Sequence, residues 1–115
     1  MKSDSLTMTL LLDYYGGLLT EKQRTCFDLY YNQDLSLSEI AEGEGISRQG
    51  VHDTIARAEG LLRRAEESAG CVARSERIRE ALVTIRAAAD DLERRGDPES
   101  RRLSGALRAA ADSIE

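Results

Sequence analysis

The sequence predicts an all-α protein, in which a helix-turn-helix bundle is followed by a C-terminal helical hairpin. The 115-residue chain is rich in Ala, Leu, Arg and Glu, which lose little conformational freedom in a helix, and it contains one proline, Pro98. Helix-capping and turn residues are spaced as in a helix-turn-helix over residues 34–62. Beyond them, apolar residues recur at intervals of three and four, which is the period of an amphipathic helix. A chain of this length can hold one modest core with a helical extension.

A first helix is expected over residues 5–15, where Gly16 and Gly17 stop it. The residues expected together on its neighbouring turns are Leu6, Thr9, Leu10, Asp13 and Tyr14. A second helix should begin at Thr20, because Gln23 stands in the capping-box position three residues later. This helix should run to about Tyr31, with an inward face of Cys26, Phe27 and Tyr30.

The segment that follows has the residue pattern of a helix-turn-helix. Ser36 and Glu39 form a second capping-box pair, and Gly45 stands where a short helix must end in a left-handed conformation. Ser47 caps the second helix of the motif, which is expected to run to about Glu66. The apolar residues expected between the two helices are Leu37, Ile40, Ala41, Val51, Ile55, Ala58 and Leu62.

A boundary is expected near Gly70, which divides the chain into a helix-turn-helix domain (1–67) and a C-terminal extension (68–115). The extension predicts a helical hairpin with a break at residues 96–98. Its apolar stripes consist of Ile78, Leu82, Ile85, Ala89 and Leu92, then Leu103, Leu107, Ala110 and Ile114. Because alanine thins both stripes, the hairpin needs a partner. The partner is either the long helix that begins at Ser47 or the same segment of a second copy, and a homodimer is the favoured expectation.

Composition narrows the function classes. No stretch approaches the roughly 20 apolar residues of a membrane span, and no signal peptide precedes the first helix, so we expect a cytoplasmic protein without membrane contact. Cys26 and Cys71 lack a CxxC spacing or a histidine partner, and Cys26 reads as a buried free thiol. The chain has no phosphate loop, metal cluster or nucleophile with its base, so we expect no enzyme activity, cofactor or metal.

The candidate nucleic-acid-binding residues lie at the start of the second motif helix. They are Ser47, Arg48, Gln49, His52 and Arg57. Arg48 and Gln49 occupy the first turn, where a recognition helix reaches base edges, and both side chains can make bidentate base contacts. They could equally be ordinary exposed helix-start residues, and His52 reads more readily as a solvated histidine. The tyrosines could stack on bases, but core packing is expected for Tyr14 and Tyr30 with Phe27, and partial exposure for Tyr15 or Tyr31.

The charge distribution opposes a simple DNA-binding interpretation. Residues 1–60 contain five Lys or Arg against ten Asp or Glu, whereas residues 61–115 contain eleven of each. DNA-binding domains typically carry a basic stripe, because Lys and Arg contacts to phosphates supply most non-specific affinity. An acidic front half instead favours docking on a basic protein partner.

Three runs of residues are specific as a set: DYYGGLLTEKQ (13–23), DLYYNQDLSLSEIAE (28–42) and ISRQGVHDTIARAEGLL (46–62). From about Leu11 to Leu62, nearly half of the chain, they resemble the YlxM family of small bacterial helix-turn-helix proteins. The resemblance implies a cytoplasmic protein with a fold similar to region 4 of sigma factors and a regulatory role in the signal recognition particle pathway. It makes DNA or signal recognition particle RNA, and the particle's GTPase subunit, the expected partners. The Ala- and Arg-rich tail after Cys71 lies outside this resemblance.

Overall fold

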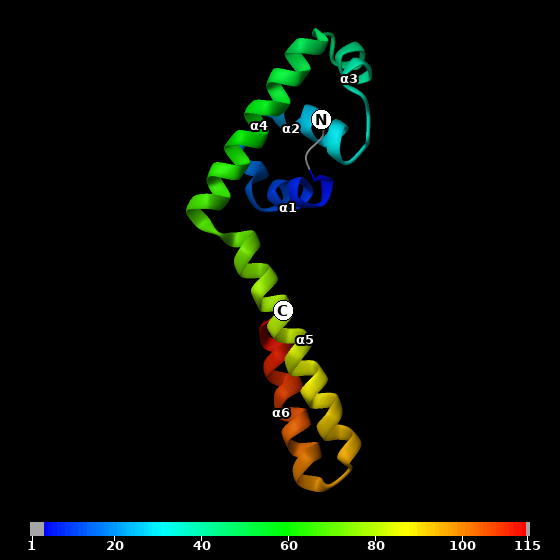
Figure 1. The fold of residues 1–115 in the computed structure, drawn as a ribbon, viewed down its shortest axis with the longest axis vertical. Coiled ribbons are helices and arrows are strands. Elements are labelled where there is room, and N and C mark those ends of the chain that lie inside the picture. Colours follow the sequence, from blue (N-terminus) through cyan, green and yellow to red (C-terminus); the bar gives the residue numbers. More distant parts are fainter. Residues whose placement is uncertain (1–3, 115) are drawn as a thin grey trace. The chain divides into compact units, whose positions relative to one another are not determined.

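The structure, a computed structural model, describes residues 4–114 and is helical throughout, with no strand in that part of the chain. In order, the elements are α1 (Ser5–Tyr15), the short 3-10 helix η1 (Gly16–Leu18), α2 (Glu21–Tyr31), α3 (Leu37–Glu44), α4 (Arg48–Ala69), α5 (Cys71–Arg95) and α6 (Pro98–Ile114) (Figure 1). The all-α fold class is therefore confirmed. The second motif helix continues past the expected end at Glu66 to Ala69, where Gly70 ends it at a φ of 65°.

The chain forms two compact units, one ending at Val72 and the other beginning at Ala73. The first unit contains α1 to α4 and the first turn of α5. The second is the hairpin of α5 and α6. The sequence analysis divided the chain into a domain (1–67) and an extension (68–115). Whether these two parts fold independently stays a prediction.

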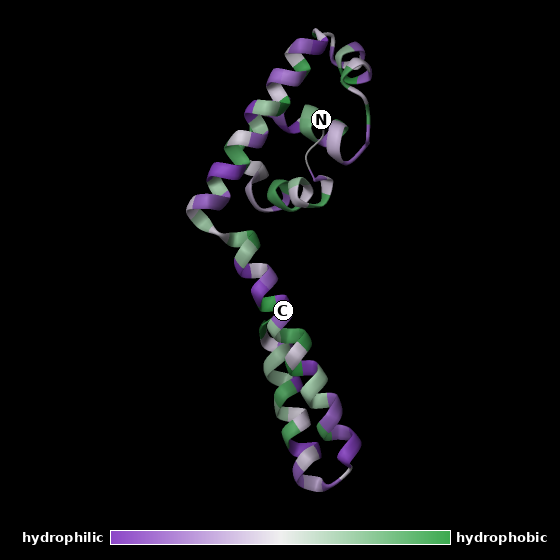
Figure 2. Cartoon of the chain, in the orientation of Figure 1, coloured by the Kyte–Doolittle hydropathy of each residue, from purple (hydrophilic) through white to green (hydrophobic). Residues whose placement is uncertain are grey.

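The core of the first unit lies between α4 and the three helices that precede it. The fully buried large side chains are Met8, Phe27, Ile40, Val51 and Leu62. They come from all four helices, so α1, α2 and α3 each contribute to one apolar cluster built along α4. Figure 2 shows the corresponding alternation of hydrophobic and hydrophilic residues along α4.

The predicted helix starts and the predicted turn are confirmed. At the start of α2 the Gln23 N–H donates to Thr20 Oγ1 (3.1 Å), and the Gln23 side chain accepts from the Thr20 N–H (2.9 Å). Ser36 and Glu39 make the same reciprocal pair at the start of α3. Gly45 ends α3 at a φ of 69°, a conformation that only glycine adopts cheaply.

The core packing expected for Tyr14 of α1 was wrong. The buried residues are Met8, Leu11, Leu12 and Tyr15. Leu6 and Tyr14 are instead exposed, at 69% and 49%. Because α1 is apolar on nearly all sides, spacing alone could not choose between its faces. The tyrosine assignment changes with it: Tyr15 and Tyr31 are buried and Tyr30 is half-buried.

The hairpin of the second unit is also built differently from the expected leucine stripes. The residues buried between α5 and α6 are small: Ala89, Ser100, Ser104 and Ala111. The Ser104 hydroxyl donates to the carbonyl oxygen of Ala89 (2.9 Å), which ties the two helices together. Only Ala89 of the predicted stripes is fully buried, whereas Ile78, Leu103 and Ile114 are exposed.

Candidate nucleic-acid interface

The candidate interface is the exposed side of α4, the second helix of the helix-turn-helix. Ser47 is its N-cap, and its hydroxyl oxygen accepts the N–H of Gly50 (2.9 Å). The tight turn at Gly45 directs the chain into this cap, with the Gly45 and Ile46 N–H groups both donating to the carbonyl oxygen of Ala41. The first turn of α4 therefore has a defined start immediately after α3.

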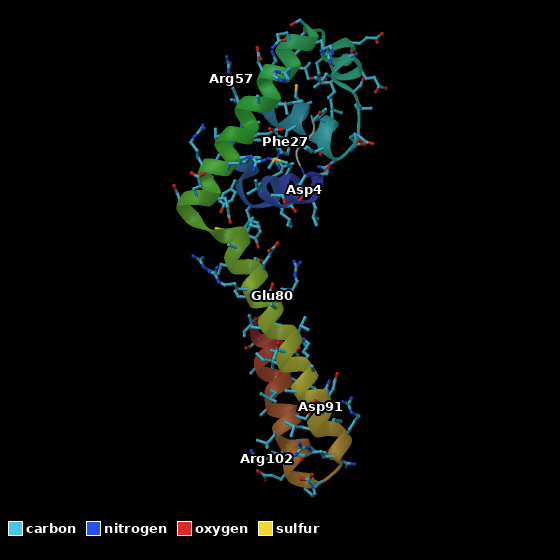
Figure 3. The ribbon with its side chains drawn as sticks, in the orientation of Figure 1. Asp4, Phe27, Arg57, Glu80, Asp91 and Arg102 are labelled. Carbon is cyan, nitrogen blue, oxygen red and sulfur yellow. The ribbon has the colours of Figure 1, made fainter. Side chains whose placement is uncertain are left out.

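The other four candidate residues, Arg48, Gln49, His52 and Arg57, are all exposed. Figure 3 shows the Arg57 side chain on the side of α4 turned away from α2. Asp53 lies among these residues. It accepts a hydrogen bond from Gln49 Nε2 (2.9 Å), and its Oδ1 lies 3.3 Å from His52 Nδ1.

Asp53 is the main acidic feature of this surface. The hydrogen bond from Gln49, and then the one shared with His52, hold the pKa of Asp53 below its ordinary value. The carboxylate therefore stays ionised and occupies the Gln49 amide in the free protein. A base or phosphate that approaches Gln49 has to compete with this contact.

Two further acidic residues of α4, Glu59 and Glu66, bond to tyrosines of the first unit, whereas a third, Glu67, is exposed. The Tyr31 hydroxyl donates to Glu59 Oε1, and the Tyr15 hydroxyl donates to Glu66 Oε1 (2.6 Å). Both glutamates are half-buried. Their charges are consequently compensated by hydrogen bonds on the inner side of α4, away from Arg57.

The sequence analysis missed two arginines of this surface, Arg63 and Arg64, which are exposed on later turns of α4. Arg57 and Arg64 lie seven residues apart, about two turns, and so occupy the same side of the helix. The four arginines Arg48, Arg57, Arg63 and Arg64 form no ion pair within 4 Å with a carboxylate of residues 4–114. A helical-wheel projection of α4 that included the residues after Leu62 would have placed Arg64 on the same side of the helix as Arg57.

Residues 2–96 match the family described as "Putative helix-turn-helix protein, YlxM / p13 like". The chain belongs to this family, UPF0122. Similar members include the UPF0122 proteins of Thermoanaerobacter sp. (strain X514), 50% identical over 100 residues that cover 86% of each chain, and of Symbiobacterium thermophilum, 42% identical over 108 residues that cover 94% of this chain and 98% of the relative. The member from Halalkalibacterium halodurans is 44% identical over 90 residues, 78% of this chain and 83% of the relative.

Membership in the UPF0122 family confirms the resemblance drawn from the sequence and extends it. The resemblance stopped at Leu62, but the family match continues through α5 to residue 96. The tail after Cys71, which the resemblance did not cover, is therefore partly within the family match: α5 lies inside it and α6 lies beyond it.

Two kinds of site, a metal site and a membrane span, are not found in the part of this UPF0122 chain that the structure describes. No three of its His, Cys, Asp or Glu side chains gather where they could hold a metal ion. Within residues 4–114, none of the helices combines the length and the apolar character that crossing a membrane requires.

Proposed function

We propose that this UPF0122 protein is a nucleic-acid-binding regulator that takes part in the signal recognition particle pathway. The binding surface consists of Ser47, Arg48, Gln49, His52 and Arg57, extended by Arg63 and Arg64. The observation that carries the proposal is the charge on α4: four arginines are exposed and form no ion pair with a carboxylate of residues 4–114, whereas Glu59 and Glu66 are half-buried and bonded to tyrosines. The chain is acidic overall, but the outward side of this helix is locally basic.

The geometry suits duplex DNA best. An α-helix fits the major groove of B-DNA, whereas the major groove of an RNA duplex is too narrow for side chains to read. Arg48 and Gln49 on the first turn would face base edges, and Arg57 and Arg64 would face phosphates. Signal recognition particle RNA is the competing ligand, since its loops offer unpaired bases.

The test measures fluorescence anisotropy with mixed-sequence duplex DNA and with signal recognition particle RNA at two salt concentrations. Arg48→Glu with Arg57→Glu should weaken binding at least tenfold and flatten the salt dependence by about one phosphate contact, that of Arg57. The matched control, Arg79→Glu with Arg101→Glu, makes the same change in net charge on exposed arginines of α5 and α6. Equal losses in both variants, or no binding by the unmodified protein, would reject the proposal.

A second function has its own support: a protein-interaction module that modulates the GTPase subunit of the particle without binding DNA. The first unit carries seven Lys or Arg against twelve Asp or Glu, so a basic protein partner would be attracted to it. It also exposes large apolar side chains on α1 and η1, namely Leu6, Tyr14 and Leu18. GTPase rates measured with the protein and with Leu6→Ser plus Leu18→Ser would test this function, and rates that never respond to the protein would exclude it.

We further propose that the protein is cytoplasmic and acts as a homodimer joined through its C-terminal hairpin. The support is the incomplete core of the hairpin, in which small residues alone are fully buried.

A further inference from the structure

The contact between α5 and α6 leaves the large apolar residues of the second unit without a core. The residues that pack between the helices are two alanines and two serines. Among residues 73–114, no leucine, isoleucine or valine is fully buried. Since hydrophobic stabilisation scales with the apolar area removed from water, this hairpin gains little from its internal contact. Large apolar side chains of the hairpin therefore remain open to solvent.

These side chains gather on one side of the hairpin. At about 100° per residue around each helix, eight apolar positions lie to the same side of the line that joins Ala89 to Ser104, with Arg77, Thr84 and Arg95 of α5 at the edge of that side. This surface, which we call the hairpin face, consists of Ala81, Ile85, Ala88, Leu92, Leu103, Leu107, Ala110 and Ile114. Leu103 is 39% and Ile114 is 54% exposed. Figure 2 shows hydrophobic residues along much of α6 and the adjoining part of α5.

The opposite side of the hairpin is charged and internally paired. Arg86 of α5 bonds to Asp112 of α6 (3.1 Å), and Arg108 of α6 bonds to Asp90 of α5 (2.6 Å). Both ion pairs bridge the two helices on the side away from the hairpin face. The hairpin therefore has one side closed by ion pairs and one mainly apolar side, which Arg77 and Arg95 border.

We propose that the hairpin face binds the hairpin face of a second copy, which completes a four-helix bundle. This inference deepens the proposed homodimer and rests on it. The charge of the chain favours a second copy: residues 73–115 contain nine Lys or Arg and nine Asp or Glu, while the first unit carries the entire net charge of −5. Two neutral hairpins can meet without repulsion, whereas two acidic first units cannot. An apolar surface is also self-complementary, as a twofold interface requires.

The size of the hairpin face is sufficient. The 17 residues of α6 extend about 25 Å, and two helices side by side are about 20 Å wide. Each copy therefore contributes roughly 500 Å², and the pair buries about 1,000 Å², the size at which specific interfaces begin. Near the centre of this interface, each copy would bury two alanines, two leucines and an isoleucine. These side chains would supply the core that a single hairpin lacks.

The test uses two double variants with identical chemistry. Ala88→Glu with Ala110→Glu places acidic groups on the hairpin face, and Ala87→Glu with Ala109→Glu places them one residue away, on the outer sides of the same helices. All four alanines are exposed, so neither variant disturbs the contact between α5 and α6. Light scattering on a sizing column, from about 1 to about 100 µM, should give twice the 12.7 kDa chain mass for the unmodified protein and the control. The face variant should be a monomer with unchanged helical circular dichroism.

Cross-linking provides a readout that does not depend on the glutamate substitutions. In a Cys71→Ser background, Ala110→Cys should give a covalent dimer with a bis-maleimide reagent, and Ala109→Cys should give much less. A monomeric unmodified protein, a face variant that stays dimeric, or equal behaviour of the two double variants would overturn the interface. None of these results would bear on nucleic-acid binding by α4, which the arginine variants test separately.

Discussion

The Tyr15 hydroxyl of α1 donates a 2.6 Å hydrogen bond to Oε1 of Glu66, near the end of α4. The same hydroxyl accepts the N–H of Cys71, and Glu66 accepts the N–H of Val72, both at 3.0 Å. The first N–H groups of a helix have no partner within it. Here side chains from α1 and α4 satisfy two of them, those of Cys71 and Val72, which are the last two residues of the first unit.

Tyr15→Phe should lower the melting temperature by about 5 °C, because it removes the hydroxyl that joins Glu66 to the Cys71 N–H. Tyr14→Phe is the matched control, since it deletes a hydroxyl from a neighbouring tyrosine that is 49% exposed. Thermal unfolding followed by circular dichroism measures both. If the two variants melt together, the Tyr15 hydroxyl contributes nothing to stability.

Stability should decline at high pH through the same residue. Burial, and then the hydrogen bond to Glu66, raise the pKa of the Tyr15 hydroxyl above its ordinary value of 10.0. An unfolded chain loses this proton near pH 10, while the folded protein retains it. The contribution of the Tyr15 hydroxyl to folding stability is therefore complete below pH 10. It is lost as the pH rises from there toward the pKa of Tyr15 in the folded protein.

The melting temperature of the unmodified protein should consequently fall more steeply than that of Tyr15→Phe between about pH 9 and about pH 11. Tyr14→Phe should follow the unmodified protein, because it keeps the Tyr15 hydroxyl. Parallel curves for all three proteins would contradict this account.

Two glycines of the helix-turn-helix should respond to alanine in opposite ways. Gly43 lies within α3 with open space around an added Cβ, so Gly43→Ala should stabilise the fold by about 0.5–1 kcal/mol. Gly45 has equal space but a φ of 69°, so Gly45→Ala should destabilise it by about 1 kcal/mol. Urea unfolding of both variants separates conformational strain from packing, and a destabilised Gly43→Ala protein would show that the space is not open.

Asp53→Asn should strengthen binding to duplex DNA about threefold to tenfold, because it removes the negative charge nearest to Gln49 and Arg57. Asp13→Asn changes the net charge equally on an exposed position of α1 and should have a smaller effect. Anisotropy titrations at one salt concentration compare the two. An equal gain from both would mean that overall charge, rather than this surface of α4, governs binding.

The helix-turn-helix could be predicted well because its signals are local. Ser36, Glu39 and Gly45 act through hydrogen bonds and backbone conformation within a few residues, so the sequence order contains the information. The apolar spacing from Val51 to Leu62 likewise belongs to one helix with one buried side.

The remaining features depend on partners distant in the sequence. The inward face of α1 is decided by contacts such as that of Tyr15 with Glu66, fifty-one residues later. The inward direction of Glu59 is decided by Tyr31 in the same way. Counting charges along the chain therefore overstated the acidity of the outer side of α4, and the arginines beyond Leu62 escaped notice.

The 22 residues of α4 run without interruption from the capping serine to Ala69. Between Ser47 and Glu66 the helix rises about 28 Å. The Tyr15 hydrogen bond and the Arg48 side chain thus lie at opposite ends of one continuous helix, with the core of the first unit packed between them. The same rigid helix therefore presents the candidate interface at its start and receives α1 at its end.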